Sequence, residues 1–148
     1  MKAVIQRVFS ASVTVNGKEV GSINRGLLIL LGVAQEDTST DLEYLVNKTV
    51  GLRIFKDKHA NMNLSIKDVS GEVLVVSQFT LCADTKKGCR PNFINAALPE
   101  IAKSVYQQYC KKMREENISV QMGQFGAMME VKLINDGPVT IVLNSRER

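Results

Sequence analysis

The sequence predicts a strand-rich α+β fold with few helices, and three observations support this prediction. Most apolar residues occur in short runs of strand length that turn residues separate. Only two segments carry apolar residues at helical spacing. The chain has 148 residues, 45% hydrophobic and 23% charged, which is typical of a globular protein. We therefore expect one domain, residues 1–148.

The first half of the chain predicts a strand, a hairpin, an apolar strand and a helix. Residues 2–9 alternate loosely between apolar and polar side chains, as in a strand. Residues 12–15 and 18–23 flank Asn16-Gly17, the dipeptide that most strongly favours a tight hairpin. Residues 27–33 are apolar throughout and predict a third strand. A helix follows, with possible N-caps at Asp37, Thr38, Ser39 and Thr40 and helical spacing from Leu42 to Val50.

The second half predicts one further helix among strands. Residues 53–55 suggest a short strand, residues 56–71 are rich in turn residues, and residues 72–81 form the next strand. A helix begins at Pro99, a residue favoured in the first helical turn, and ends near Asn117. Its core-facing residues are expected to be Ile101, Ala102, Val105, Tyr106, Tyr109 and Met113. The last strands are expected at 118–122, 129–134 and 139–143.

Composition restricts the partners and the compartment. The net charge of +4 permits an anionic partner such as RNA but does not require one. No apolar run is long enough for a membrane-spanning helix, and the N-terminus lacks a secretory signal. Three cysteines make no disulfide framework and favour a reducing compartment. A cytoplasmic protein with no membrane partner is therefore expected.

The side chains that usually carry out hydrolysis are missing from the sequence. The single histidine, His59, lies in a polar segment with no evident nucleophile beside it. Cys82 and Cys89 lack the partner pair of a zinc site, and no nucleotide-binding motif is present. We therefore expect no metal and no cofactor. If the protein is an enzyme, its catalysis must come from another source.

The segment Val73–Leu81, VLVVSQFTL, changes character within one predicted strand. Four aliphatic residues indicate burial, and Ser77, Gln78 and Thr80 then follow without a turn residue. Strand periodicity places Ser77 and Phe79 on one face and Gln78 and Thr80 on the other. This end of the strand either lines a pocket or simply emerges into solvent.

Two glycine-containing segments in the last third of the chain also stand out. NDGPVT, residues 135–140, is either a plain turn between two strands or a cis Gly137-Pro138 that reads the space around a small group. GQFGAMM, residues 123–129, is either a close-packed pocket wall or the bulged start of a strand.

Seven segments together resemble the D-aminoacyl-tRNA deacylase family, in that family's order and spacing. They are MKAVIQRV at the start, LRIF at 52–55, MNLS at 62–65, VSQFTL at 76–81, TKKG-RP-F across 85–93, FGAMM at 125–129 and NDGPVT at 135–140. Asn61, where the family pattern has Lys, and the cysteines Cys82 and Cys89 are departures that leave the two central motifs intact.

The resemblance implies a β-barrel-like fold with two or three helices and a homodimer that cleaves the ester between a D-amino acid and the terminal adenosine of tRNA. Ser77, Gln78, Phe79 and Thr80 are the expected catalytic residues and form the pocket floor. Main-chain N–H groups around Phe79 and Thr80 would stabilise the oxyanion, and the substrate's ribose hydroxyl would help position water. Thr80 as a covalent nucleophile is the rival interpretation, but it lacks an evident base.

The resemblance also implies how substrate is selected. Gly137 and Pro138, with a cis bond, would enter the partner subunit's pocket and leave no room for an L side chain. Glycyl-tRNA would also be accepted as a substrate, because glycine has no side chain to exclude. Phe125 and Met129 are expected either to contact substrate or to pack in the core. Lys86, Lys87 and Arg90 are expected either to contact tRNA phosphates or to form a solvated basic loop.

Two alternatives to this function remain at the level of the sequence. One is a nucleic-acid-binding relative that keeps the fold without catalysis. The other is a related deacylase with altered chirality and a trans Gly137-Pro138 bond.

Overall fold

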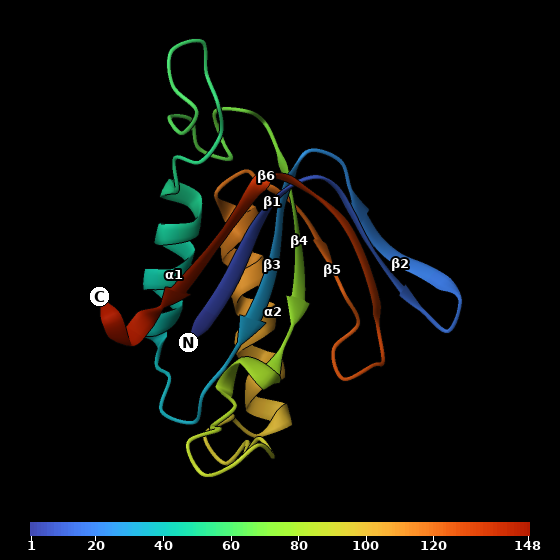
Figure 1. Ribbon diagram of the computed structural model, residues 1–148, viewed down its shortest axis with the longest axis vertical. Coiled ribbons are helices and arrows are strands. Elements are labelled where there is room, and N and C mark those ends of the chain that lie inside the picture. Colours follow the sequence, from blue (N-terminus) through green and yellow to red (C-terminus); the bar gives the residue numbers. More distant parts are fainter.

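A long first strand organises the sheet. The structure is a computed structural model that describes residues 1–148 (Figure 1). Its elements are β1 (Lys2–Val15), β2 (Lys18–Ile23), β3 (Gly26–Gly32), α1 (Ser39–Gly51), β4 (Glu72–Ser77), the 3₁₀ helix η1 (Phe79–Cys82), α2 (Pro99–Glu115), β5 (Ser119–Met122), β6 (Glu130–Asn144) and the 3₁₀ helix η2 (Ser145–Glu147). Residues 2–8 of β1 pair with β3, residues 11–15 pair with β2, and β6 pairs along residues 2–14.

The six strands form one curved sheet of order β2-β1-β3-β4-β5, with β6 on β1. The β3–β4 and β4–β5 pairs are parallel, and the three pairs of β1 are antiparallel. Register shifts interrupt the β1–β6 and β1–β2 pairings, and such irregularities bend strands. The sheet therefore curls into the nearly closed, barrel-like form that the family resemblance implied.

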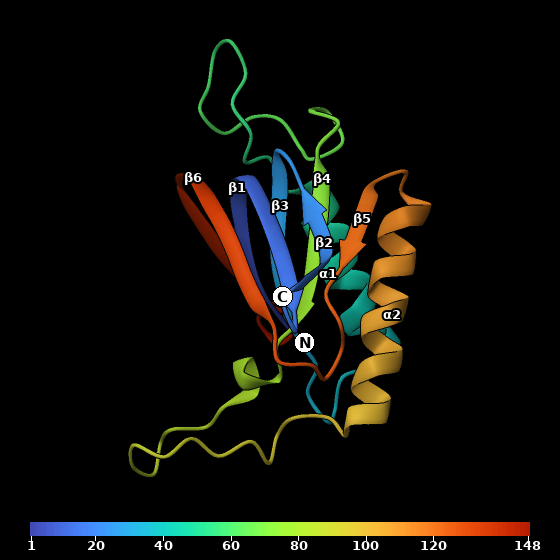
Figure 2. The ribbon, with the colours of Figure 1, turned by 90° about the vertical axis from the view of Figure 1, so that its right-hand side faces the viewer.

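Two apolar clusters lie on opposite faces of the central strands. Leu27 and Ile29 of β3 belong to the larger cluster, which both helices cover, whereas Leu28 belongs to the smaller cluster inside the curl. Both helices lie on the same side of the sheet (Figure 2). Strands buried on both faces need apolar residues at every position, which explains the uninterrupted apolar runs of β3 and β4.

The helices begin where their sequences indicate. The Asp41 carboxylate accepts hydrogen bonds from the Thr38 N–H (2.8 Å) and the Thr38 hydroxyl (2.9 Å), which caps α1. Pro99 begins α2, and Tyr109 donates to or accepts from Thr49 of α1 at 2.8 Å, tying the helices together. Neither helix combines the length and apolarity that crossing a bilayer requires.

Four local predictions differ from the structure, besides the end of β4 that is described below. The strands expected at 2–9 and 12–15 are one strand, because β6 pairs with β1 across both segments. Residues 53–55 form only an isolated bridge from Phe55 to Leu64. Ile101 was expected in the core but is exposed, since the buried stripe of α2 starts at Ala102.

The fourth difference concerns the last strands. Residues 129–134 and 139–143 were expected as two strands with NDGPVT as a possible turn, and that turn interpretation is wrong. Instead β6 continues through Gly137-Pro138, and the register shift between Gln6 and Val8 absorbs the extra residues. The hairpin at Asn16-Gly17 is confirmed, with φ values of 50° and 75°.

Candidate active site

The strand predicted over residues 72–81 ends four residues early. β4 stops at Ser77, and the Gln78 N–H donates to the Leu31 carbonyl at 2.8 Å before the chain turns into η1. The predicted alternation of faces over residues 77–80 is therefore wrong, because a 3₁₀ turn replaces the pleat. Ser77 and Gln78 are half-buried, and Phe79 and Thr80 are exposed.

The turn leaves two main-chain donors unused. The N–H groups of Phe79 and Thr80 donate to no acceptor in the chain, as is usual for the first residues of a helical turn. The Thr80 hydroxyl accepts a hydrogen bond from the Gln78 side-chain amide at 2.5 Å, and no carboxylate, lysine or histidine contacts it. The geometry thus offers adjacent N–H donors rather than an activated hydroxyl.

The segment after η1 carries the basic residues. Asp84 and Asn92 pair through two backbone hydrogen bonds of 2.8 and 2.9 Å and close a loop. Lys86, Lys87 and Arg90 all lie exposed on that loop, and none makes an ion pair within the chain. The exposed Phe79 ring packs edge-to-face on Phe93, with centroids 5.0 Å apart, which ties the loop to η1.

Gly137 and Pro138 form an exposed bulge on β6. Their peptide bond is cis, not trans as one alternative requires. Gly137 has φ +144°, and a Cβ there would lie 2.7 Å from Val139 Cγ2 and 2.8 Å from Val139 N. Only glycine fits this position without displacing its neighbours.

Two residues that sequence reasoning missed hold the bulge. Arg7 donates from Nε to the Asp136 carbonyl (3.0 Å), pairs with the Asp136 carboxylate (3.3 Å), and donates to the Ile54 carbonyl. Asn135 accepts from Val139 N–H at 2.8 Å and donates to the Val139 carbonyl at 3.1 Å. A charged residue within an otherwise mostly apolar strand was the available signal for Arg7. The sequence alone did not pair Asn135 with Val139.

The bulge and η1 lie on different parts of the sheet in one chain. The bulge sits beside Arg7, which pairs with Leu27, and Leu27 pairs with Val73. Ser77 is four residues further along β4, about 13 Å, and three strands across from β6. The chain's own Gly137-Pro138 is therefore not adjacent to its own η1.

Phe125 and Met129 lie beside the end of β4. The Gly123 N–H donates to the Val75 carbonyl at 2.9 Å, which anchors this segment. The Phe125 ring lies 5.9 Å from the Tyr106 ring, and Met129 packs against the smaller core cluster. Both side chains are half-buried, so they contact the core and also present some surface to solvent.

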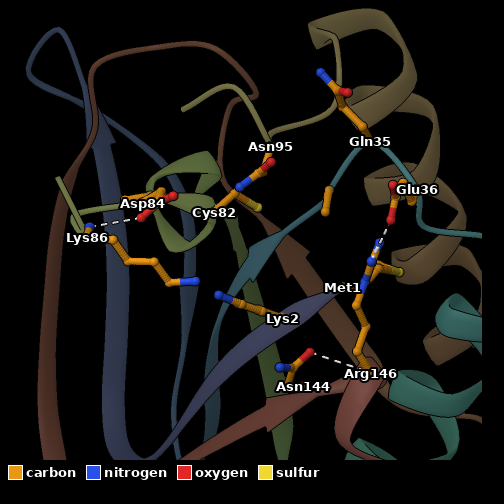
Figure 3. Close-up of a pocket in the computed structure, with 12 residues that line it drawn as sticks. Met1, Lys2, Gln35, Glu36, Cys82, Asp84, Lys86, Asn95, Asn144 and Arg146 are labelled. Carbon is orange, nitrogen blue, oxygen red and sulfur yellow. Dashed lines mark hydrogen bonds and ion pairs between the residues drawn. The ribbon is translucent and has the colours of Figure 1, made fainter. Parts of the chain in front are cut away.

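A polar cavity of about 390 Å³ lies on the other side of η1 (Figure 3). It is lined by Met1, Lys2, Ala34, Gln35, Glu36, Cys82, Ala83, Asp84, Lys86, Asn95, Asn144 and Arg146. Burial, then the nearby Asp37 charge, raises the pKa of the Cys82 thiol, which contacts the Val33 carbonyl. Cys82 is therefore a protonated packing residue at neutral pH. No three His, Cys, Asp or Glu side chains gather as a metal site.

Two solved structures share this fold. The c-Myc DNA unwinding element binding protein superposes with a TM-score of 0.91 and 42% identity, over 97% of this chain and 98% of its own. A probable eukaryotic D-amino acid tRNA deacylase superposes with a TM-score of 0.82 over 96% and 97% of the two chains, and its 18% identity supports the fold alone. The molecule thus has the strand-rich α+β fold of a D-amino acid tRNA deacylase.

Sequence relatives give the family. D-aminoacyl-tRNA deacylases of Desulfatibacillum aliphaticivorans and Thermosipho melanesiensis are 56% and 54% identical, each over 99% of this chain and at least 99% of their own length. That of Clostridioides difficile is 53% identical over 98% of this chain and 97% of its own. The D-Tyr-tRNA(Tyr) deacylase family pattern matches residues 4–144. The chain belongs to the D-Tyr-tRNA(Tyr) deacylase family and, as a member, is a hydrolase.

Proposed function

We propose that this protein hydrolyses the ester of D-aminoacyl-tRNA and releases the free D-amino acid and tRNA. The observation that carries the proposal is the pair of unused N–H groups at Phe79 and Thr80, in a chain of this family. Water attacks the ester carbonyl, the bond from the carbonyl carbon to the ribose oxygen breaks, and the departing ribose oxygen takes a proton from the attacking water and becomes a hydroxyl. The N–H pair stabilises the negative charge that develops on the carbonyl oxygen.

An aminoacyl ester is already activated toward hydrolysis, so modest stabilisation of the transition state is sufficient. Thr80 bonds to Gln78 and has no base, so we assign it a role through its main chain rather than as a nucleophile. Ser77 and Gln78 complete the pocket floor, and Phe125 and Met129 wall it on the β5 side.

We further propose that Gly137-Pro138 of one subunit enters the pocket of the other in a homodimer. The separation of this dipeptide from η1 within one chain supports a site shared by two copies. Phe9, Ile134 and Val142 are apolar and 57–67% exposed on β1 and β6, the strands beside the bulge, as an interface requires. The inserted dipeptide excludes L side chains, so D-aminoacyl-tRNA and glycyl-tRNA are substrates in a chiral proofreading reaction.

The basic loop completes the proposal. Lys86, Lys87 and Arg90 contact tRNA phosphates without reading sequence. We place the protein in the cytoplasm, where aminoacyl-tRNA is used, and treat residues 1–148 as one domain because both helices share one core with the sheet.

Cleavage of charged tRNA tests the proposal. Purified protein is mixed with D-tyrosyl-tRNA, L-tyrosyl-tRNA or glycyl-tRNA, and the remaining ester is followed with time. We expect the D-tyrosyl and glycyl esters to disappear and the L-tyrosyl ester to survive, with about a hundredfold or greater discrimination between the two hands. Rapid loss of the L-ester, or a stable D-ester, contradicts the proposal.

A second candidate is a nucleic-acid-binding protein without catalysis. The name of the c-Myc DNA unwinding element binding protein, with 42% identity to this chain, favours it. Binding of uncharged tRNA and duplex DNA at several salt concentrations distinguishes the two. Strong, salt-dependent binding without ester cleavage would support this candidate.

A further inference from the structure

Two lysines face each other in the cavity beside η1. Figure 3 shows the side chains of Lys2 and Lys86 extending toward one another from β1 and from the basic loop. Lys2 Nζ donates to the Leu81 carbonyl of η1 at 3.2 Å. Neither ammonium group makes an ion pair within the chain. Two converging ammonium groups, neither of which is paired with a carboxylate, favour an anion at this point.

The other charged groups of the cavity are already engaged. Arg146 pairs with Glu36 at 2.7 Å and lies 3.6 Å from Asp37. Asp84 accepts the backbone N–H of Lys86 at 2.9 Å, which turns its carboxylate toward its own loop. The Asn95 side chain makes no hydrogen bond within the chain and also lines the cavity. Lys2, Lys86 and Asn95 therefore offer unused donors to a bound anion.

The cavity lies between the two parts of the proposed substrate path. Cys82 and Ala83, at the end of η1, form one wall, and Asp84 and Lys86, at the base of the basic loop, form the next. The terminal adenosine is proposed to react at η1, and more distant phosphates to bind the loop. A tRNA strand that joins these points passes the cavity.

We propose that the cavity is a subsite for one backbone phosphate of the tRNA 3′ end, next to the terminal adenosine, bound by Lys2 and Lys86. The inference rests on the proposed function. Lysine binds phosphate as a point charge, and the two ammonium groups neutralise it from opposite sides. The contact positions the acceptor end and carries no base specificity.

Substrates that differ in phosphate content test the proposal. D-tyrosyl esters of adenosine, of the trinucleotide CCA and of full tRNA are compared, since the adenosine ester has no phosphate. For Lys86→Gln and Lys2→Gln we expect KM to rise about tenfold with the CCA and tRNA esters and to stay unchanged with the adenosine ester. The kcat values stay near those of the unaltered protein.

Three controls sharpen the experiment. Lys18→Gln makes the same charge change on the exposed hairpin, where no ion pair is lost, and should change no KM. Lys2→Arg keeps a cation and should restore tRNA binding. Because both lysines contact one phosphate, the double variant should raise KM by less than the product of the single effects.

Each other outcome has a distinct meaning. Equal losses with all three esters show that Lys2 and Lys86 act on η1 itself, and unchanged KM values show that the cavity binds no phosphate; either result overturns the inference. If the unaltered protein cleaves none of the three D-esters, the proposed function fails instead.

Discussion

At the scale of single residues, the bulge on β6 depends on the absence of a side chain at Gly137. Gly137 has no room for a Cβ because Val139 lies 2.7 to 2.8 Å from where it would be. Arg7 and Asn135 then hold the backbone on either side of this glycine. The sequence motif identified the bulge, but the groups that fix its position come from two strands.

Gly137→Ala should abolish D-ester cleavage, because the methyl group would clash with Val139 and, in the proposed dimer, would intrude into the partner's pocket. We expect the rate with D-tyrosyl-tRNA to fall at least about a hundredfold. Gly51→Ala is the matched control, since a Cβ at Gly51 contacts nothing and its φ is not positive. Near-normal activity of Gly137→Ala would refute the insertion.

Asn135→Leu should weaken chiral discrimination more than stability. The substitution keeps side-chain size but removes both hydrogen bonds to Val139, so the bulge loses its position. We expect kcat for the D-ester to fall about tenfold and the ratio of D to L cleavage to narrow. Thermal unfolding monitors stability in parallel, and an unchanged D to L ratio rules out this positioning role.

At the scale of elements, the start of α1 depends on one acidic residue. Burial raises the pKa of Asp41, but hydrogen bonds from Thr38 outweigh burial and hold this pKa well below its ordinary value. Arg148 also pairs with Asp41 at 3.2 Å, which links α1 to the end of the chain. Thr38 was one of the N-cap candidates in the sequence, whereas the roles of Asp41 and Arg148 were not predicted.

Asp41→Asn should flatten the acid dependence of stability. A carboxyl group with a lowered folded-state pKa stabilises the protein above its unfolded pKa, near 3.9, and loses this contribution as pH falls below it. The unaltered protein should therefore lose free energy of unfolding below about pH 4, and Asp41→Asn should lose less. At pH 7 the variant should be less stable by about 1 kcal/mol, through loss of the cap. Urea unfolding at pH 7 and pH 3 measures both effects, and parallel curves contradict the assignment.

At the scale of the whole molecule, the proposed site needs two copies. Thr80→Pro removes one N–H that donates to nothing in the chain, and proline is tolerated in a first helical turn. Gly137→Ala spoils the inserted dipeptide instead. In a mixed dimer, one site combines an intact η1 with an intact Gly137, and the other carries both changes.

Unfolding the two inactive variants, mixing them and refolding the mixture should restore activity. Random reassociation makes half of the dimers mixed, each with one intact site, so about a quarter of the full activity should return. Size-exclusion chromatography confirms the dimer. No recovery in a confirmed mixture means that each site lies within one chain.

The sequence by itself determined the elements whose signals are local. Turn geometry at Asn16-Gly17, the starts of both helices and the apolar runs of β3 and β4 need only neighbouring residues to be interpreted. The resemblance to the family supplied the rest of the assignment. Local propensity also suggested a strand through Leu81 and a turn at 135–140, and both were wrong.

Tertiary structure alone decided how those motifs are used. β4 ends after Ser77 because the Leu81 N–H donates to the Gln78 carbonyl and closes the 3₁₀ turn. β6 runs through Gly137-Pro138 because β1 offers pairing on both sides of it. Lys2 and Lys86, 84 residues apart in the chain, meet in one cavity only through the fold. Such contacts depend on strand pairing between distant segments, which no local pattern encodes.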